Sequence, residues 1–175
     1  MTQIRWRVRD AEAGELDALA ALWHDAWHDG HAVIVPKDLV ALRTLDDFRA
    51  RLPAMLDALR TIGPVGAPLG LCVIREDEMQ QLFVAAEARG TGVAAQLLAD
   101  AERRLAQAGV SEAWLDAAIG NDRAIRFYER AGWAKSRIAD EPLDTAEGKG
   151  RYILRVQIMV KRVADAAPKH DPAAR

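Results

Sequence analysis

The chain has 175 residues, of which 50% are hydrophobic and 29% are charged, and its formal net charge is −2. This length and composition predict one globular domain, and the lack of a basic excess argues against binding to nucleic acid through general electrostatic attraction. The single cysteine, Cys72, excludes an intrachain disulfide and any zinc or iron–sulfur site built from several cysteines.

Targeting signals and linkers are absent from the sequence pattern. No uncharged apolar run approaches the roughly 18–20 residues of a membrane-spanning helix, and the first residues lack the apolar region of a signal peptide. We therefore expect no membrane partner and a cytoplasmic location, which agrees with the lone cysteine. We also expect a single domain over residues 1–163 and a disordered tail over residues 164–175, where Pro168 and Pro172 lie.

The N-terminal part of the chain predicts one strand followed by helices. The expected elements are a strand at 4–9, a helix from about 10 to 28, a short helix at 39–42, and a helix that begins after residue 44 and extends to 59. Apolar residues alternate with arginines in the strand. Asp10 is placed to cap the first helix, Gly30 to end it and Thr44 to cap the last one, while Pro53 predicts a break or kink.

The rest of the chain predicts a β-hairpin and then alternating strands and helices. The expected elements are strands at 69–74 and 79–84, a helix at 92–108, a strand at 113–119, a helix at 122–130, a strand at 133–138, a polar loop at 140–150 and a strand at 152–163. Gly109 is placed to end the first of these helices and Asn121 to cap the second. With one more strand before the hairpin, assigned to no particular residues, this order predicts a mixed α/β fold with a βαβ-like centre.

The turn that opens the helix at 92–108 is the segment most suited to chemistry. It reads Arg89-Gly90-Thr91-Gly92. The first N–H groups of a helix have no partner inside it, glycines let an anion approach the backbone, and an arginine adds a bidentate cation. An anion such as a phosphate is therefore expected here, although glycines at such a turn also have the simpler role of satisfying its geometry.

A dinucleotide-binding turn is a second interpretation of the same residues. Gly90-x-Gly92-x-x-Ala95 matches that fingerprint, and Asp116 lies near the position of its ribose-binding acid. Against it, a connector separates Gly90 from the end of the strand at Val84, and too little chain remains for the other parallel strands of such a domain.

Two motifs resemble the signatures of the GCN5-related N-acetyltransferase family. Arg89-x-x-Gly92-x-Ala94 resembles the pyrophosphate loop of that family, and Leu82-Phe83-Val84 resembles its splayed strand. A second segment resembles the other signature of the family and reads Asn121-x-x-Ala124-x-x-Phe127-Tyr128-x-x-x-Gly132-Trp133. Two signatures at the separation found in the family are more specific than either alone, and the resemblance covers most of the chain.

The resemblance implies a fold, a donor and a reaction. The fold is α/β, with a mixed and mostly antiparallel sheet, a splayed central strand pair and about four flanking helices. The donor is acetyl-CoA, from which the acetyl group passes directly to a primary amine of a small molecule, peptide or protein. The residues implied to bind acetyl-CoA are Phe83, Val84, Arg89, Gly90, Thr91, Gly92, Val93, Ala94, Asn121 and Tyr128.

The same resemblance implies roles for single groups in the transfer. The family places a tyrosine hydroxyl near the sulfur of coenzyme A, so Tyr128 is expected to be the general acid. The N–H group of Val84 is expected to polarise the acetyl carbonyl. Asn121 is expected to cap its helix and also to contact the coenzyme arm.

The general base stays open between several groups. Many members of the family use a glutamate on the strand where this chain has Gln80 and Gln81, and an amide cannot accept the proton of the amine. Asp116 is expected to be the base or a substrate anchor. Glu78, His31 and a water molecule are the alternatives.

Three histidines fall close together near the end of the first predicted helix. His24 and His28 share a helix face at a spacing that metal sites use, but no acidic third ligand is specified. We therefore expect no metal, and His31 is the member expected to contact substrate. Trp23 and Trp27 are expected in the core.

The sequence does not specify the acceptor. It also leaves open an acyl group longer than acetyl. Folds of this kind commonly form homodimers, which adds a second copy of the chain to the expected partners. A non-catalytic acyl-CoA sensor or scaffold is the alternative function, because the strand glutamate of the family is missing.

Overall fold

A seven-stranded sheet with the strand order β1-β2-β3-β4-β5-β7-β6 forms the centre of the protein, whose computed structural model describes residues 6–145 and 148–164. The strands are β1 (Val8–Asp10), β2 (Leu59–Ile62), β3 (Gly70–Arg75), β4 (Glu78–Val84), β5 (Glu112–Ala118), β6 (Ala134–Thr145) and β7 (Gly148–Arg162). The α-helices are α1 (Leu16–His31), α2 (Lys37–Leu42), α3 (Leu45–Arg51), α4 (Val93–Gln107) and α5 (Asp122–Arg130). Short 3₁₀ segments lie at Ala13–Glu15, Leu52–Ala58 and Ala86–Ala88.

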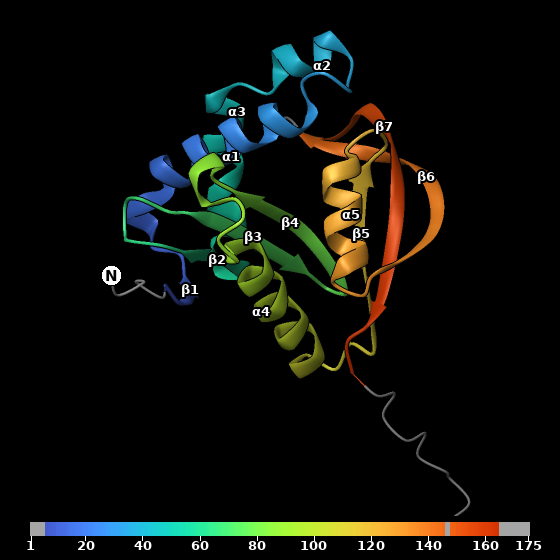
Figure 1. The fold of residues 1–175 in the computed structure, drawn as a ribbon. Coiled ribbons are helices and arrows are strands. Elements are labelled where there is room, and N and C mark those ends of the chain that lie inside the picture. The colour runs from blue at the N-terminus through green and yellow to red at the C-terminus, as the bar shows by residue number, and fades with distance from the viewer. Residues whose placement is uncertain (1–5, 146–147, 165–175) are drawn as a thin grey trace, which may run out of the picture.

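The central strands β4 and β5 diverge, and this divergence confirms the predicted splayed pair. They form the parallel pair of the sheet, whereas the other neighbouring strands run antiparallel. Their pairing is confined to Glu78 opposite Trp114, next to a hydrogen bond from Trp114 N–H to the Asp77 carbonyl. Beyond this point the strands separate, and the sheet opens between them (Figure 1).

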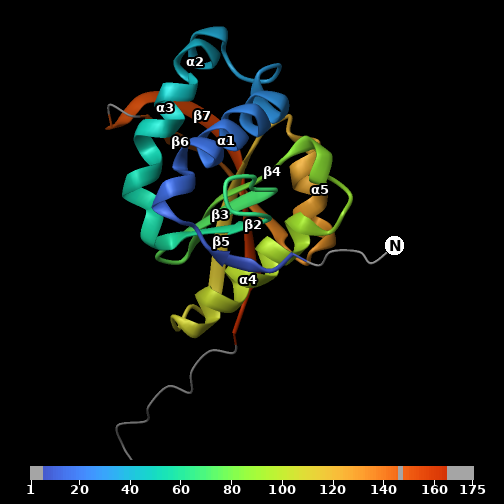
Figure 2. The same ribbon diagram turned by 90° about the vertical axis from the view of Figure 1, so that its left-hand side faces the viewer.

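Helices cover both faces of the sheet. In Figure 1, α4 crosses the half of the sheet that holds β2, β3 and β4, while α5 lies along β5 and β7. Seen from the side, α1, α2 and α3 gather on the other side of the strands (Figure 2). Each side has a buried core: Leu97 and Leu105 of α4 belong to one, and Trp23 packs against Phe48 at 4.9 Å between ring centroids in the other.

The first helix differs from the prediction at both ends. Asp10 is the last residue of β1, and the chain enters α1 through a capping box in which the Glu15 carboxylate accepts from Glu12 N–H. Glu15 is buried and paired with Arg9 at 2.7 Å, which fixes this entry. At the other end the helix passes through Gly30, because the following residues continue as hydrogen-bonded turns and do not require a left-handed glycine.

The segment after Thr44 confirms two predictions and corrects a third. Thr44 caps α3 by accepting from Asp47 N–H at 3.1 Å, and the α-helix stops before Pro53, where a 3₁₀ segment takes over. Leu59 does not lie on the helix but begins β2, which is the strand left without residues in the prediction. The four residues of β2 are held between β1 and β3, so their strand form depends on distant partners.

The polar loop expected at 140–150 is wrong, since β6 and β7 extend through most of it as a long hairpin. β6 is an edge strand and much of its first part is exposed, which explains its polar sequence. Pro142 sits at an irregularity of the register, as is usual for proline in an edge strand. Residues 4 and 5 of the first predicted strand and residues 165–175 of the predicted tail lie outside the described residues.

The single cysteine provides a direct test of the packing. Cys72 lies on β3, is fully buried, and burial raises the pKa of its thiol to about 12. We expect no reaction with a thiol reagent at pH 8 in the native protein and complete reaction in guanidinium chloride, because only the thiolate is nucleophilic. Rapid labelling of the folded protein, measured by absorbance, would contradict this packing.

No helix among the described residues is long and apolar enough to cross a membrane.

Candidate active site

Two cavities meet where β4 and β5 separate. The first, of about 470 Å³, is bounded by α1, β4, the turn before α4, the end of β5 and α5. The second, of about 380 Å³, lies toward α1, α3 and the β6–β7 hairpin. The residues that line both are His31, Gln80, Gln81, Phe83, Asp116 and Ala118. These six residues border both cavities, and we call them the junction.

The turn before α4 presents backbone N–H groups to the first cavity. Gly90 and Gly92 have φ values of +74° and +86°, and a Cβ at either position would meet nothing within 4 Å. Gly92 is the N-cap of α4 and offers no side-chain cap. Because the first intrahelical bond runs from Gln96 N–H to the Gly92 carbonyl, the N–H groups of the preceding turn of the helix need another acceptor. The uncapped end of a 15-residue helix therefore provides an anion site.

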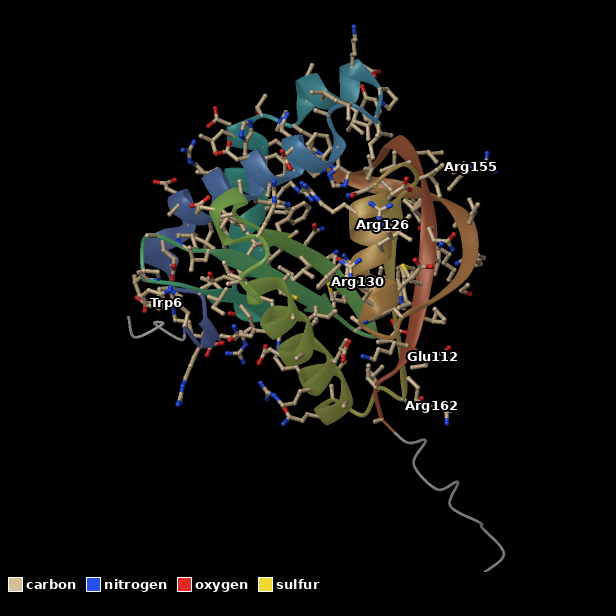
Figure 3. The ribbon with its side chains drawn as sticks, viewed as in Figure 1. Trp6, Glu112, Arg126, Arg130, Arg155 and Arg162 are labelled. Carbon is tan, nitrogen blue, oxygen red and sulfur yellow. The ribbon has the colours of Figure 1, made fainter. Side chains whose placement is uncertain are left out.

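Three arginines line the same cavity, which adds positive charge to that anion site. Arg89 and Arg123 both pair with Asp29 of α1, at 2.7 and 3.0 Å. The pKa of the Asp29 carboxyl is below its usual value, and the hydrogen bond from Arg123 is the largest cause of this shift. Arg130 is the third, and Figure 3 shows it on the side of α5 nearer to α4. The carboxylate of Asp29 occupies part of an arginine cluster that suits a polyanionic ligand.

The Val84 N–H group points into the opening between the strands. Ala85 N–H donates to the Leu69 carbonyl at 2.9 Å, on the β3 side of β4. Successive N–H groups of a strand point to opposite edges, so the Val84 N–H faces β5. The described pairing of β4 with β5 does not extend this far, which leaves the donor directed at the first cavity.

Tyr128 is buried, with 7% of its surface exposed, yet it lines the first cavity. Its ring contacts Phe127 and Trp133 at 5.2 and 6.4 Å between centroids. Among the described residues no hydrogen bond is made to its hydroxyl. Burial raises the pKa of Tyr128 well above its ordinary value, so the hydroxyl stays protonated at neutral pH. It is therefore a hydrogen donor available to a ligand.

His31 is held as a neutral imidazole at the junction of the cavities. Its ring stacks on Trp27 at 5.1 Å, and its Nδ1 lies 3.0 Å from the Trp27 carbonyl. Because a carbonyl only accepts, this bond assigns the proton to Nδ1 and leaves Nε2 as the basic nitrogen. Burial lowers the pKa of His31, and the charges of Arg43 and Arg123 lower it further.

The other candidate bases, Asp116 and Glu78, differ in exposure and in the cavities that they line. Asp116 is exposed on β5 and lines both cavities, whereas Glu78 is half-buried at the start of β4 and lines only the second. The register of β3 with β4 shifts so that Gln80 is the extra residue of a β-bulge. Bulges redirect side chains, and both Gln80 and Gln81 reach the junction.

The model of one protein family, described as the acetyltransferase (GNAT) family, matches residues 4–133. The chain belongs to this family. Within this GNAT chain, β4 is the splayed strand and the turn at residues 89–92 is the loop before the helix, as the sequence motifs predicted.

Solved structures agree on the fold. A GCN5-related N-acetyltransferase from Rhodopseudomonas palustris aligns with a TM-score of 0.71 and 18% identity over 93% of this chain and 98% of that one. PaiA N-acetyltransferase from Thermoplasma acidophilum, in complex with coenzyme A, has a TM-score of 0.71 and 16% identity over 91% and 99%. YncA from Salmonella typhimurium, with its cofactor acetyl-CoA, has a TM-score of 0.66 and 16% identity over 95% and 99%. No curated protein sequence matches the chain.

Most of the residues expected from the GNAT resemblance lie around the first cavity. Those that line it are Phe83, Val84, Arg89, Gly90, Gly92, Ala94, Asn121 and Tyr128, together with Asp116. Thr91 and Val93 do not line it: the Thr91 hydroxyl donates to the Ala88 carbonyl at 2.6 Å, and the Val93 side chain is buried in the core. Asn121 caps α5 as predicted, accepting from Ala124 N–H at 3.3 Å.

Several residues that line the two cavities were not predicted. Arg123 stands in the first turn of α5, where a cation opposes the helix dipole, and this unfavourable position was the available signal. Arg43 and Arg51 line the second cavity but carry no motif. Among the described residues, no group of three or more His, Cys, Asp or Glu side chains is placed to hold a metal ion.

Proposed function

We propose that this protein transfers an acetyl group from acetyl-CoA directly to a primary amine. The observation that carries the proposal is the junction of the two cavities at the splay of β4 and β5, with the uncapped end of α4 at one side. The donor would lie in the first cavity and the amine in the second. Family membership supports the reaction, and the coenzyme A complexes of PaiA and YncA support the donor.

The donor fits the first cavity by charge and shape. The pyrophosphate would accept from the N–H groups at the start of α4, with Arg89 and Arg123 beside it after release of Asp29. The pantetheine arm would run along the free edge of β4, where Val84 offers its N–H group. This assignment uses backbone groups of Thr91 and Val93, because their side chains face elsewhere.

The transfer would use two groups of the first cavity, Val84 N–H and Tyr128, and two residues of the junction, His31 and Asp116. The amine nitrogen bonds to the acetyl carbon, Val84 N–H donates to the developing oxyanion, and the bond from carbon to sulfur breaks. Tyr128 donates a hydrogen to the departing sulfur. Asp116 attracts the substrate ammonium, and His31 Nε2, which is unprotonated, accepts one of its protons before the attack. The second proton leaves the nitrogen as the adduct collapses and replaces the one that Tyr128 gives to the sulfur.

The role of His31 predicts a pH dependence. Its neutral form is the active one and burial lowers its pKa, so the acid limb of kcat/KM should lie at a lower pH than the titration of an ordinary imidazole. We expect His31→Gln to remove this acid limb and to lower the rate by about 10²-fold, which is typical of a lost general base. His24→Gln is the control, because His24 lies on the same helix but pairs with Asp25 outside both cavities. An unchanged acid limb in His31→Gln would assign the base to Asp116 or Glu78.

The test of the function combines binding with turnover. Calorimetric titration with acetyl-CoA should give one site per chain, and thiol release should follow addition of amines from a panel of amino acids, peptides, polyamines and aminoglycosides. Absence of binding at millimolar acetyl-CoA would overturn the proposal. Binding without thiol release by any amine would favour the sensor, a function that the glutamines at positions 80 and 81 would also fit.

A further inference from the structure

Two buried arginines line the second cavity. Arg43 follows α2 and is 3% exposed, and Arg51 ends α3 and is 8% exposed. Arginine is rarely buried to this extent without a specific partner. The positive charge of each side chain therefore needs partners inside the cavity or its walls.

The contacts of Arg43 leave part of its guanidinium unsatisfied. Nη1 lies 3.1 Å from Oδ2 of Asp47, an oxygen that Arg51 also approaches, at 3.6 Å. Among the described residues Asp47 is the one acidic partner of Arg43, and the buried Nε of Arg43 has no hydrogen-bond partner there. Because Arg43 shares one oxygen of Asp47 with Arg51, the positive charge of its guanidinium is only partly compensated by this carboxylate, and an additional anion in the cavity would be favoured.

Aromatic rings fix the direction of both guanidinium groups. The Arg43 guanidinium carbon lies 5.8 Å from the centre of the Trp27 ring, and that of Arg51 lies 4.4 Å from the Trp23 ring. Trp27 also stacks on His31, so Arg43 and His31 both contact one indole beside the junction. After burial, the positive charge of Arg43 is among the causes that lower the pKa of His31.

Acidic side chains line other parts of the same cavity. Asp116 lies at the junction, Glu78 begins β4, and Glu141 comes from β6. The cavity thus combines the buried positive charge of Arg43 and Arg51 near α2 and α3 with mostly acidic side chains on the side of the sheet, where Arg75 also lines it. A ligand that carries one charge of each sign matches this distribution better than a polyamine or a plain alkylamine.

We propose that the acceptor is a primary amine that also carries a carboxylate, and that Arg43 binds this carboxylate while the amine lies at the junction. The proposal rests on the proposed function and narrows its substrate class to amino carboxylic acids. Arg51 holds Asp47 and Trp23 in place beside Arg43 and extends the same positive surface.

Matched acceptors test the proposal in the wild-type protein. Thiol release is measured with glycine, β-alanine, 4-aminobutyrate, 6-aminohexanoate and a set of L-amino acids, each against its carboxamide. We expect the best acid to exceed its amide by about 10²-fold in kcat/KM, because a charge-assisted hydrogen bond is lost in the amide. Amides turned over as well as acids, or polyamines turned over in preference, would overturn the proposal while leaving the acetyl transfer intact.

A variant pair assigns the preference to Arg43. Arg43→Met should bring the acid-to-amide ratio to about 1, while Arg43→Lys should keep part of it. Arg49→Met is the matched control, since Arg49 lies on α3 but faces solvent, where it pairs with Asp17 and Asp46. A ratio that survives in Arg43→Met would overturn the assignment, and the acid-to-amide comparison in wild type remains decisive if that variant fails to fold.

Binding separates this inference from the proposed function. Calorimetric titration of the protein saturated with coenzyme A should detect the best acid and not its amide. Such binding without turnover of any amine would support the carboxylate site and contradict the transferase. Absence of carboxylate binding at 10 mM, together with absence of turnover, would overturn both.

Discussion

Replacing Tyr128 by phenylalanine should lower kcat by about 10²-fold and leave the KM for acetyl-CoA within about threefold, because the hydroxyl acts on the departing sulfur and not on the bound coenzyme. Tyr128 lines the cavity, and its hydroxyl has no hydrogen-bond partner among the described residues, so its loss breaks no hydrogen bond there. We therefore expect a thermal midpoint within about 2 °C of wild type. Steady-state thiol release at saturating acceptor measures the first effect.

The control for this variant is the same substitution at the other tyrosine. Tyr152 donates to Asp38 at 3.2 Å and lines neither cavity, so Tyr152→Phe should keep the wild-type kcat. A raised KM with an unchanged kcat in Tyr128→Phe would show that Tyr128 only binds the coenzyme. An unfolded Tyr128→Phe protein would show that the hydroxyl is structural.

The second large effect is expected at the start of α4. Gly92→Val should raise the dissociation constant of acetyl-CoA by about 10- to 100-fold, since the side chain would cover N–H groups that are proposed to bind the pyrophosphate. The variant should also lose about 1–2 kcal/mol of folding stability, because Gly92 has a φ of +86°. Calorimetric titration and thermal unfolding separate the two effects.

Gly109 provides a control matched in backbone and surroundings. It follows the other end of α4, has a φ of +88°, and a Cβ there would also meet nothing within 4 Å. Gly109→Val should therefore lose similar stability without loss of acetyl-CoA binding. Equal affinities for the two variants would contradict an anion site at the start of the helix.

The parts of the site that the sequence predicted are those encoded by local patterns. The glycines at positions 90 and 92 need left-handed backbone at a turn, and Asn121 caps the helix that directly follows it. Each signal requires only its own few neighbours in the chain. The splayed strand was expected because of the motif that follows it, and its single paired position confirms the expectation.

The parts that escaped prediction depend on distant partners. β2 is a strand because β1 and β3 lie on either side of it, and the hairpin of β6 with β7 extends through a segment whose polar composition resembles a loop. Arg43 and Arg51 look like ordinary surface charges in the sequence. Only the packing of α1 against α3 buries them beside Trp23 and Trp27.

The pairing of Arg89 and Arg123 with Asp29 links the fold to donor binding. Asp29 belongs to α1, which also carries His31 at the junction. When the donor binds, its phosphate oxygens would replace the Asp29 carboxylate as partners of the two arginines. The ion pairs that connect α1 with the turn before α4 and with α5 would then be lost. Arg89 and Arg123 thus connect the anion site with the helix that bears the proposed base.

The central claim is direct transfer between two ligands bound at once, and two-substrate steady-state kinetics test it most directly. Initial rates of thiol release are measured while acetyl-CoA and an accepted amine are varied together, with the acetylated amine quantified by mass spectrometry. Because Cys72 is buried with a raised pKa and cannot carry the acetyl group, we predict intersecting double-reciprocal lines and one acetylated amine per thiol released. Parallel lines, which indicate an acetylated enzyme intermediate, or thiol release without acetylated amine would contradict the account.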